Sequence, residues 1–148
     1  MTEVEAVRAR VVHYLAARRA IEAWALASME KALAGPAGGP SPRLEAELDE
    51  AFARFRAEHL TAHAQVLVGG RIALGSPSVV DADHLEIVRI NVEGRSASVH
   101  TLEDETAGAL APTPYEYTLA WERGDWRIDN RRTPRDVRRG SKWIDLLV

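Results

Sequence analysis

The chain has 148 residues, of which 46% are hydrophobic and 28% charged, and its formal net charge is -3. This length favours one domain with one core, and the composition is typical of soluble globular proteins, not of disordered, fibrous or membrane proteins. The sequence contains no cysteine, which excludes disulfides, cysteine-ligated metal centres and thiol nucleophiles.

No secretory signal is expected at the start of the chain. Residues 1–5 are acidic, without the basic and apolar regions of a secretory signal. Charged residues also interrupt every apolar run before it reaches the roughly 18 residues of a membrane-spanning helix. We therefore expect a cytoplasmic protein that makes no contact with a membrane.

A long helix is predicted at the N-terminus. Thr2 and Glu5 have capping-box spacing, and apolar residues then recur at helical intervals as far as Leu33. We expect this helix to run from about residue 3 to residue 33. It ends because glycine and proline crowd residues 35–40.

Ser41 and Pro42 form a typical helix start, with a capping hydroxyl followed by a proline that needs no backbone N–H. A second helix is predicted from there to about His59. Its buried face is expected to consist of Leu44, Leu48, Phe52, Phe55 and His59.

After about Leu60 the pattern changes to the alternation typical of strands. The predicted strands are 65–68, 85–92, 95–102, 115–121 and 126–132. Short turns containing Gly94 and Gly124 predict two antiparallel hairpins.

This order of elements predicts an α+β fold in which the helices cover one face of an antiparallel sheet. A single domain is expected to span residues 1–148. Residues 1–40 contribute the first helix and the Gly/Pro linker, and residues 41–148 the second helix and the sheet.

Several short motifs resemble one superfamily. Tyr115–Leu119 in one strand, Gly124 in the turn and Trp126–Asp129 in the next strand resemble the nuclear transport factor 2-like superfamily. Within it, the chain is most similar to the bacterial immunity-protein family of this fold. That likeness runs from about residue 44 to residue 145, and it also includes the residues Gly75, Ser76, Pro77, Asp81, Ala97–Thr101, Gly140 and Trp143.

The resemblance implies a cone-shaped domain whose sheet is strongly bent around the N-terminal helices. It also implies a cytoplasmic bacterial immunity protein that binds and neutralises a cognate toxin and needs no cofactor. Members of the superfamily commonly dimerise through the outer face of the sheet, so a homodimer is expected.

Side chains alternate across a strand, so the apolar face of the last two strands should line the cone. The expected cavity-lining residues are Tyr115, Tyr117, Leu119, Trp121, Trp126 and Ile128. By the same alternation Asp129 points outward between Arg127 and Arg131, as half of a surface ion pair. His100 is likewise expected on the outer face or at the rim.

We expect no catalysis, because this lining contains no acid–base pair. The rival hypothesis is a small-molecule isomerase, cyclase or dehydratase that uses Tyr14, Tyr115 or His100 inside the cone. A buried carboxylate or histidine hydrogen-bonded to a tyrosine would favour the rival.

No metal site is predicted. His59 and His63 have the spacing of a helical metal chelate, but only if one helix continues through both residues. No HExxH pattern surrounds the pair.

Charged residues near the end of the chain are the candidate contacts for the toxin, because they are expected to be exposed and least needed by the core. They are the acidic residues Glu103, Asp104 and Glu105 at the start of a loop that ends at Pro114, and the basic residues Arg131, Arg132 and Arg135. The alternative is a solvated arginine-rich segment. Nucleic acid is disfavoured as a partner, because the domain as a whole is acidic.

Overall fold

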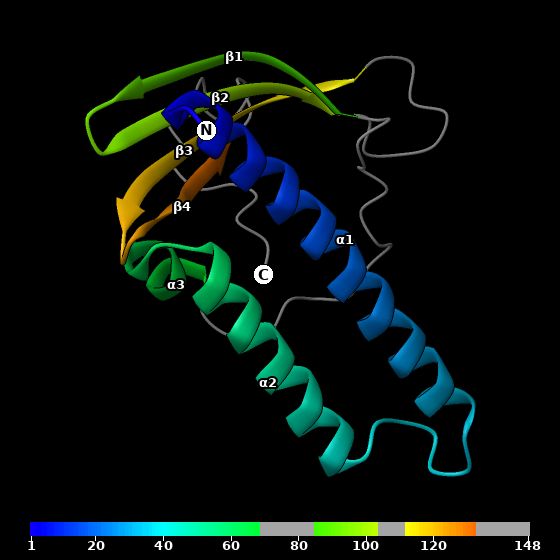
Figure 1. Cartoon of the computed structure of the whole chain (residues 1–148). Helices are drawn as coiled ribbons and strands as arrows, with labels where there is room; N and C mark the ends of the chain where they lie inside the picture. The colour runs from blue at the N-terminus through cyan, green and yellow to red at the C-terminus, as the bar shows by residue number, and fades with distance from the viewer. Residues whose placement is uncertain (69–84, 104–111, 133–148) are drawn as a thin grey trace.

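Three helices precede four strands in the computed structural model, which describes residues 1–68, 85–103 and 112–132 (Figure 1). The elements are α1 (Glu3–Ala34), α2 (Pro42–His59), α3 (Ala62–Val68), β1 (Leu85–Glu93), β2 (Ser96–Glu103), β3 (Thr113–Glu122) and β4 (Asp125–Arg132).

Both long helices begin at the predicted caps. The Thr2 hydroxyl accepts a hydrogen bond from the Glu5 backbone N–H at 3.1 Å, and the Glu5 carboxylate accepts one from the Thr2 N–H at 2.8 Å. The Ser41 hydroxyl accepts from the Leu44 N–H at 3.1 Å, ahead of Pro42 in the first turn of α2. These local contacts satisfy N–H groups that have no partner inside the helix.

The strand predicted over 65–68 is wrong, because these residues belong to the helix α3. Thr61 explains the difference. Its hydroxyl accepts a hydrogen bond from the Ala64 N–H at 3.0 Å and so acts as a helix cap, while its own N–H donates to the Ile128 carbonyl of β4 at 3.0 Å. Apolar runs this short do not distinguish a strand from a helix by periodicity alone.

The strands form one antiparallel sheet in the order β1-β2-β3-β4. Both predicted hairpins are confirmed. In the β3–β4 turn Arg123 and Gly124 have positive φ angles of 55° and 78°. Two successive positive φ angles match the twist of a two-residue hairpin, and glycine adopts them without a steric cost.

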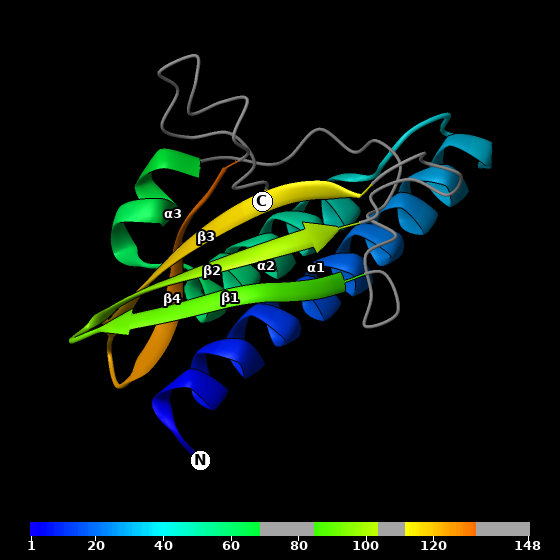
Figure 2. The same ribbon diagram turned by 90° about the horizontal axis from the view of Figure 1, so that it is seen from above.

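Helices α1 and α2 run antiparallel to each other and lie against the same face of the sheet (Figures 1 and 2). Helix α1 contacts β1, β2 and β4, and α2 contacts β4. The predicted α+β architecture is therefore confirmed. The far end of the helical pair extends beyond the sheet (Figure 1), and residues 26–47 contain no buried side chain.

Candidate functional site

The face of the sheet that the helices cover carries a continuous set of buried side chains. Alternate residues of β2, β3 and β4 form this inner face, namely Ala97, Val99, Thr101, Glu103, Tyr115, Tyr117, Leu119, Trp126 and Ile128. The ring of Tyr14 from α1 meets Tyr117 edge to face, with centroids 6.3 Å apart.

Five of the six predicted cavity-lining residues lie on this inner face. The sixth, Trp121, is 41% exposed at the end of β3, where it contacts the buried Trp126 with ring centroids 5.7 Å apart. That these side chains line an open cavity stays a prediction.

Glu103 and Arg131 are not at the surface, contrary to the expected exposure that made them candidate toxin contacts. Their side chains are 0% and 2% exposed, and Arg131 Nη2 donates to Glu103 Oε1 at 2.8 Å. Burying one of these charges alone would be costly, so the two compensate each other.

Tyr117 joins this pair. Its hydroxyl donates to Glu103 Oε2 at 2.9 Å and accepts from Arg131 Nε at 2.8 Å. The Thr101 hydroxyl also donates to Glu103 Oε2, and the Arg131 guanidinium carbon lies 3.6 Å from the ring centroid of Tyr115. We call Thr101, Glu103, Tyr115, Tyr117 and Arg131 the inner-face network.

A β-bulge explains why alternation misplaced Arg131. Thr118 pairs with Asn130 but its neighbour Leu119 pairs with Ile128, so β4 has one extra residue, Asp129, at this point. An extra residue reverses the alternation beyond it. Arg131 therefore lies opposite the inward Tyr117.

The burial of Glu103, unlike that of Arg131, does not depend on a β-bulge. Simple alternation along β2 puts Ala97, Val99 and Thr101 on one face, and Glu103 is the next residue in that series. A carboxylate two residues after Thr101 was therefore a usable signal for a buried acid.

Burial raises the pKa of Tyr117 well above 10, and the nearby Glu103 carboxylate adds to this while Arg131 opposes it. Burial alone would lower the pKa of Arg131, but Tyr117 and Glu103 raise it well above its ordinary value. At neutral pH the network therefore holds a protonated phenol and a guanidinium cation.

Both oxygens of Glu103 already accept hydrogen bonds, and one of them faces a guanidinium. A general base needs a free lone pair aimed at a substrate proton. The buried hydroxyl of Tyr14, by contrast, has no hydrogen-bond partner among the described residues.

The inner face also contains a buried carboxylate, Glu103, that is hydrogen-bonded to a tyrosine, Tyr117. Such a contact is the observation that would favour an enzyme.

On the outer face, His100 lies where alternation predicted, with 31% of its side chain exposed. It contacts Arg89 at 3.1 Å and Glu116 at 3.5 Å. Arg132 donates to Glu116 at 2.7 Å. This arrangement is a ladder of paired charged side chains across the sheet.

Asp129 does not form the expected ion pair with its neighbouring arginines. It accepts a hydrogen bond from the Thr61 hydroxyl at 2.6 Å, and Arg127 instead donates to the Ala57 and Glu58 carbonyls at the end of α2. Three of the candidate toxin contacts, Asp104, Glu105 and Arg135, lie outside the described residues.

The two long helices leave a hollow of about 350 Å³ between them, lined by Trp24, Glu47, Glu50, Ala51 and Arg54. Trp24 is 41% exposed. Both carboxylates of the hollow have an arginine partner on α2, with Arg54 3.9 Å from Glu50 and Arg43 3.3 Å from Glu47, and all four side chains are exposed. An exposed tryptophan beside carboxylates suits a partner that presents cationic and apolar groups.

His59 and His63 could chelate a metal ion together only if one helix continued through both. This is not the case, because α2 ends at His59 and α3 begins at Ala62.

Within the ranges described, no helix combines the length and apolarity needed to cross a membrane. Comparison with known proteins gives no match, whether to a family model, a curated protein or a solved structure.

Proposed function

We propose that this chain is a non-catalytic binding protein with a nuclear transport factor 2-like fold, an immunity protein that neutralises a cognate bacterial toxin by direct binding. The fold is supported by the order of two long helices before an antiparallel sheet. The motifs that carry the resemblance, Tyr115–Leu119 and Trp126–Asp129, lie side by side in the β3–β4 hairpin.

The state of the inner face supports a binding role over catalysis. The Glu103 carboxylate is compensated by Arg131 and hydrogen-bonded by Tyr117, so neither of its oxygens is free to act as a general base. This favours a binding function at the surface.

The observation that carries the proposal is the hollow between α1 and α2. Trp24 in its lining is 41% exposed. The helical pair extends beyond the sheet (Figure 1). Aromatic side chains surrounded by charged ones frequently contribute most of the binding energy of an interface. We therefore propose the hollow, and not the buried Glu103 and Arg131, as the surface that contacts the toxin.

The charged side chains at this end of the helical pair indicate which kind of partner would bind there. Five carboxylates, Glu30, Glu45, Glu47, Asp49 and Glu50, are exposed around this end of the helical pair, against the three cations Lys31, Arg43 and Arg54. We therefore infer that the toxin presents a basic surface to it. Such complementarity raises association rates and makes binding sensitive to salt.

The experiment is coexpression of the full chain with a toxin-like product of the adjacent gene, where that gene encodes one. Rescue of growth and a complex on size exclusion are expected. Trp24→Ala should raise the Kd at least about 30-fold, since a central aromatic contributes about 2 kcal/mol or more. Glu47→Lys should also weaken binding.

Trp121→Ala is the matched control, because Trp121 is as exposed as Trp24 but lies on the sheet. It should leave the Kd unchanged. Absence of rescue and of a complex overturns the proposed function, whereas a complex that is weakened only by Trp121→Ala overturns the proposed surface.

The homodimer is proposed through the outer face of β1, where Val88 is 58% exposed. Sedimentation equilibrium should show a dimer that Val88→Glu converts to a monomer. A monomer at all concentrations contradicts it.

One observation favours a second function, a small-molecule enzyme of the isomerase, cyclase or dehydratase type. It is the buried Glu103–Tyr117 hydrogen bond near the unpartnered hydroxyl of Tyr14. The variant Glu103→Gln, which keeps the shape of the side chain, distinguishes the two functions. Folded Glu103→Gln protein that still neutralises the toxin supports immunity. Turnover of a small molecule by the wild type that this variant loses would support the enzyme.

A further inference from the structure

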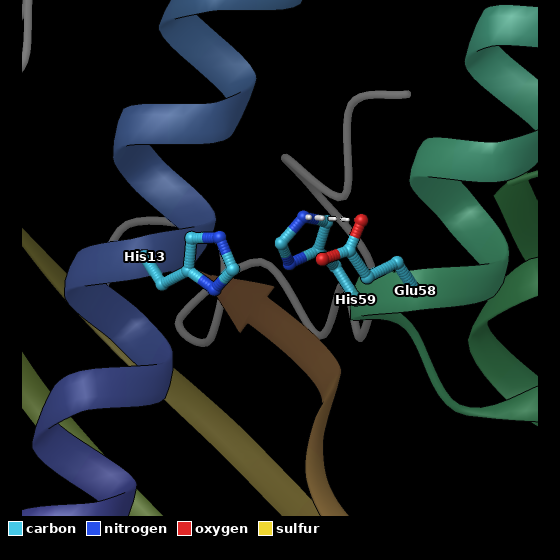
Figure 3. A group of neighbouring side chains, drawn as sticks. All are labelled: His13, Glu58 and His59. Carbon is cyan, nitrogen blue, oxygen red and sulfur yellow. Dashed lines mark ion pairs between the residues drawn. The ribbon is translucent and has the colours of Figure 1, made fainter.

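His13 of α1 lies beside the end of α2, where Glu58 and His59 are adjacent (Figure 3). One potential ligand atom from each of these side chains lies within 4.8 Å of the other two. The two imidazole centroids are 5.0 Å apart, and Glu58 Oε2 is 3.8 Å from His59 Nε2. Packing of the two helices thus brings two imidazoles and a carboxylate together.

His59 is the buried member of this group of three side chains. Its side chain is 1% exposed, and its Nδ1 is buried with no hydrogen-bond partner among the described residues. An imidazole nitrogen that no other group occupies is available to coordinate a metal ion.

Two cations also face His59. Arg10 of α1 forms an ion pair with Asp125, and Arg127 of β4 donates to the backbone carbonyls of α2 at 2.6 and 2.8 Å. Their charge weakens the binding of another cation, and the Glu58 carboxylate offsets part of this effect. Metal affinity at this position depends on Glu58 for that reason.

We propose that His13, Glu58 and His59 bind one divalent transition-metal ion of the zinc class. Two imidazole nitrogens and one carboxylate oxygen are a typical zinc donor set, with water in the fourth position. Metal–ligand bonds of about 2.0–2.1 Å place tetrahedral donors roughly 3.4 Å apart, and the three side chains already bring ligand atoms within 4.8 Å of one another.

His13 and Glu58 are exposed, so rotation of their side chains can complete the geometry around the buried His59. The bound ion would join α1 directly to the end of α2. It would stabilise the folded chain, because these ligands meet only after the helices pack. This site is independent of the proposed toxin surface.

The test uses the full chain freed of metal by a chelator that is then removed. Calorimetry with Zn²⁺ should give one ion per chain, and Co²⁺ should give the intense visible absorption of a four-coordinate site. At a Zn²⁺ concentration about a hundredfold above Kd, the Tm should rise by roughly 5 to 10 °C.

His13→Gln and Glu58→Gln alter exposed side chains and should leave the fold intact, unlike a change of the buried His59. Each should weaken Zn²⁺ binding at least about tenfold. His63→Gln, a change of an exposed histidine on α3, is the matched control and should bind as the wild type does. Absence of the Co²⁺ absorption, or binding that neither His13→Gln nor Glu58→Gln weakens, overturns the site.

Discussion

Arg131 lies at the centre of the inner-face network, between Glu103, Tyr117 and the ring of Tyr115. A buried ion pair of this kind adds little net stability compared with apolar residues of similar volume. Loss of one partner is costly, because the other charge then lies buried without compensation. The two statements together predict a strong energetic coupling between Glu103 and Arg131.

We expect Arg131→Met and Glu103→Met each to lower the free energy of unfolding by about 3–5 kcal/mol. The double variant should lose clearly less than the sum of the two, because it leaves no unpaired charge. Urea denaturation of the four proteins measures this coupling. Arg132→Met is the control, since Arg132 is partly exposed and pairs with Glu116 on the outer face, and should cost at most about 1 kcal/mol. Additive losses at 103 and 131 would contradict the network.

Tyr117 makes the stability of the protein sensitive to alkaline pH. Its pKa is raised in the folded protein, so the phenol stays protonated there at a pH where the unfolded chain already loses the proton. Unfolding is therefore favoured as the pH rises past about 10. Between about pH 9 and about pH 11 the wild type should lose about 1 kcal/mol more stability than Tyr117→Phe. Equal losses in urea titrations of the two proteins would show that Tyr117 ionises normally.

Among the elements, the junction of α2 and α3 connects the helical layer to the last strand. The Thr61 hydroxyl donates to Asp129 and accepts from the Ala64 N–H. One side chain therefore caps α3 and binds the bulged residue of β4.

Thr61→Val keeps the shape of the side chain but removes both hydrogen bonds. It should lower the free energy of unfolding by about 1–3 kcal/mol, the combined effect of a lost cap and an unpaired buried partner. Thr61→Ser retains the hydroxyl and should stay within about 1 kcal/mol of the wild type in urea denaturation. Two variants of equal stability would show that the hydroxyl has no role here.

At the scale of the whole molecule, α1 packs on both edges of the sheet through β1 and β4. Helices and sheet share one hydrophobic core, which includes Val11 and Leu48 from the helices and Val99 and Ile128 from the sheet. A shared core predicts that the two layers unfold together.

Far-ultraviolet circular dichroism reports mainly on the helices, and the fluorescence of the buried Trp126 reports on the sheet. We expect both signals to change in one transition with the same urea midpoint. Trp24→Phe/Trp121→Phe removes two of the fluorophores in the described residues and makes the fluorescence signal more specific to Trp126. Separate midpoints would show two independent units and contradict the single domain.

Much of the fold follows from local sequence. Thr2, Ser41 and Pro42 determine where the helices begin, and Gly94 and Gly124 determine the hairpin turns, because caps and turns depend on residues only a few positions apart. Alternation within a strand is equally local. It correctly placed Tyr117 inside and His100 outside, and it contained the signal for Glu103.

The bulge at Asp129 and the meeting of His13 with Glu58 and His59 were decided by tertiary structure alone. The bulge exists only in the pairing of β4 with β3, and it alone turns Arg131 inward. The three candidate metal ligands come together only when α1 packs beside the end of α2. Composition, caps and alternation act within one segment, whereas these positions depend on contacts between segments that lie far apart in the sequence.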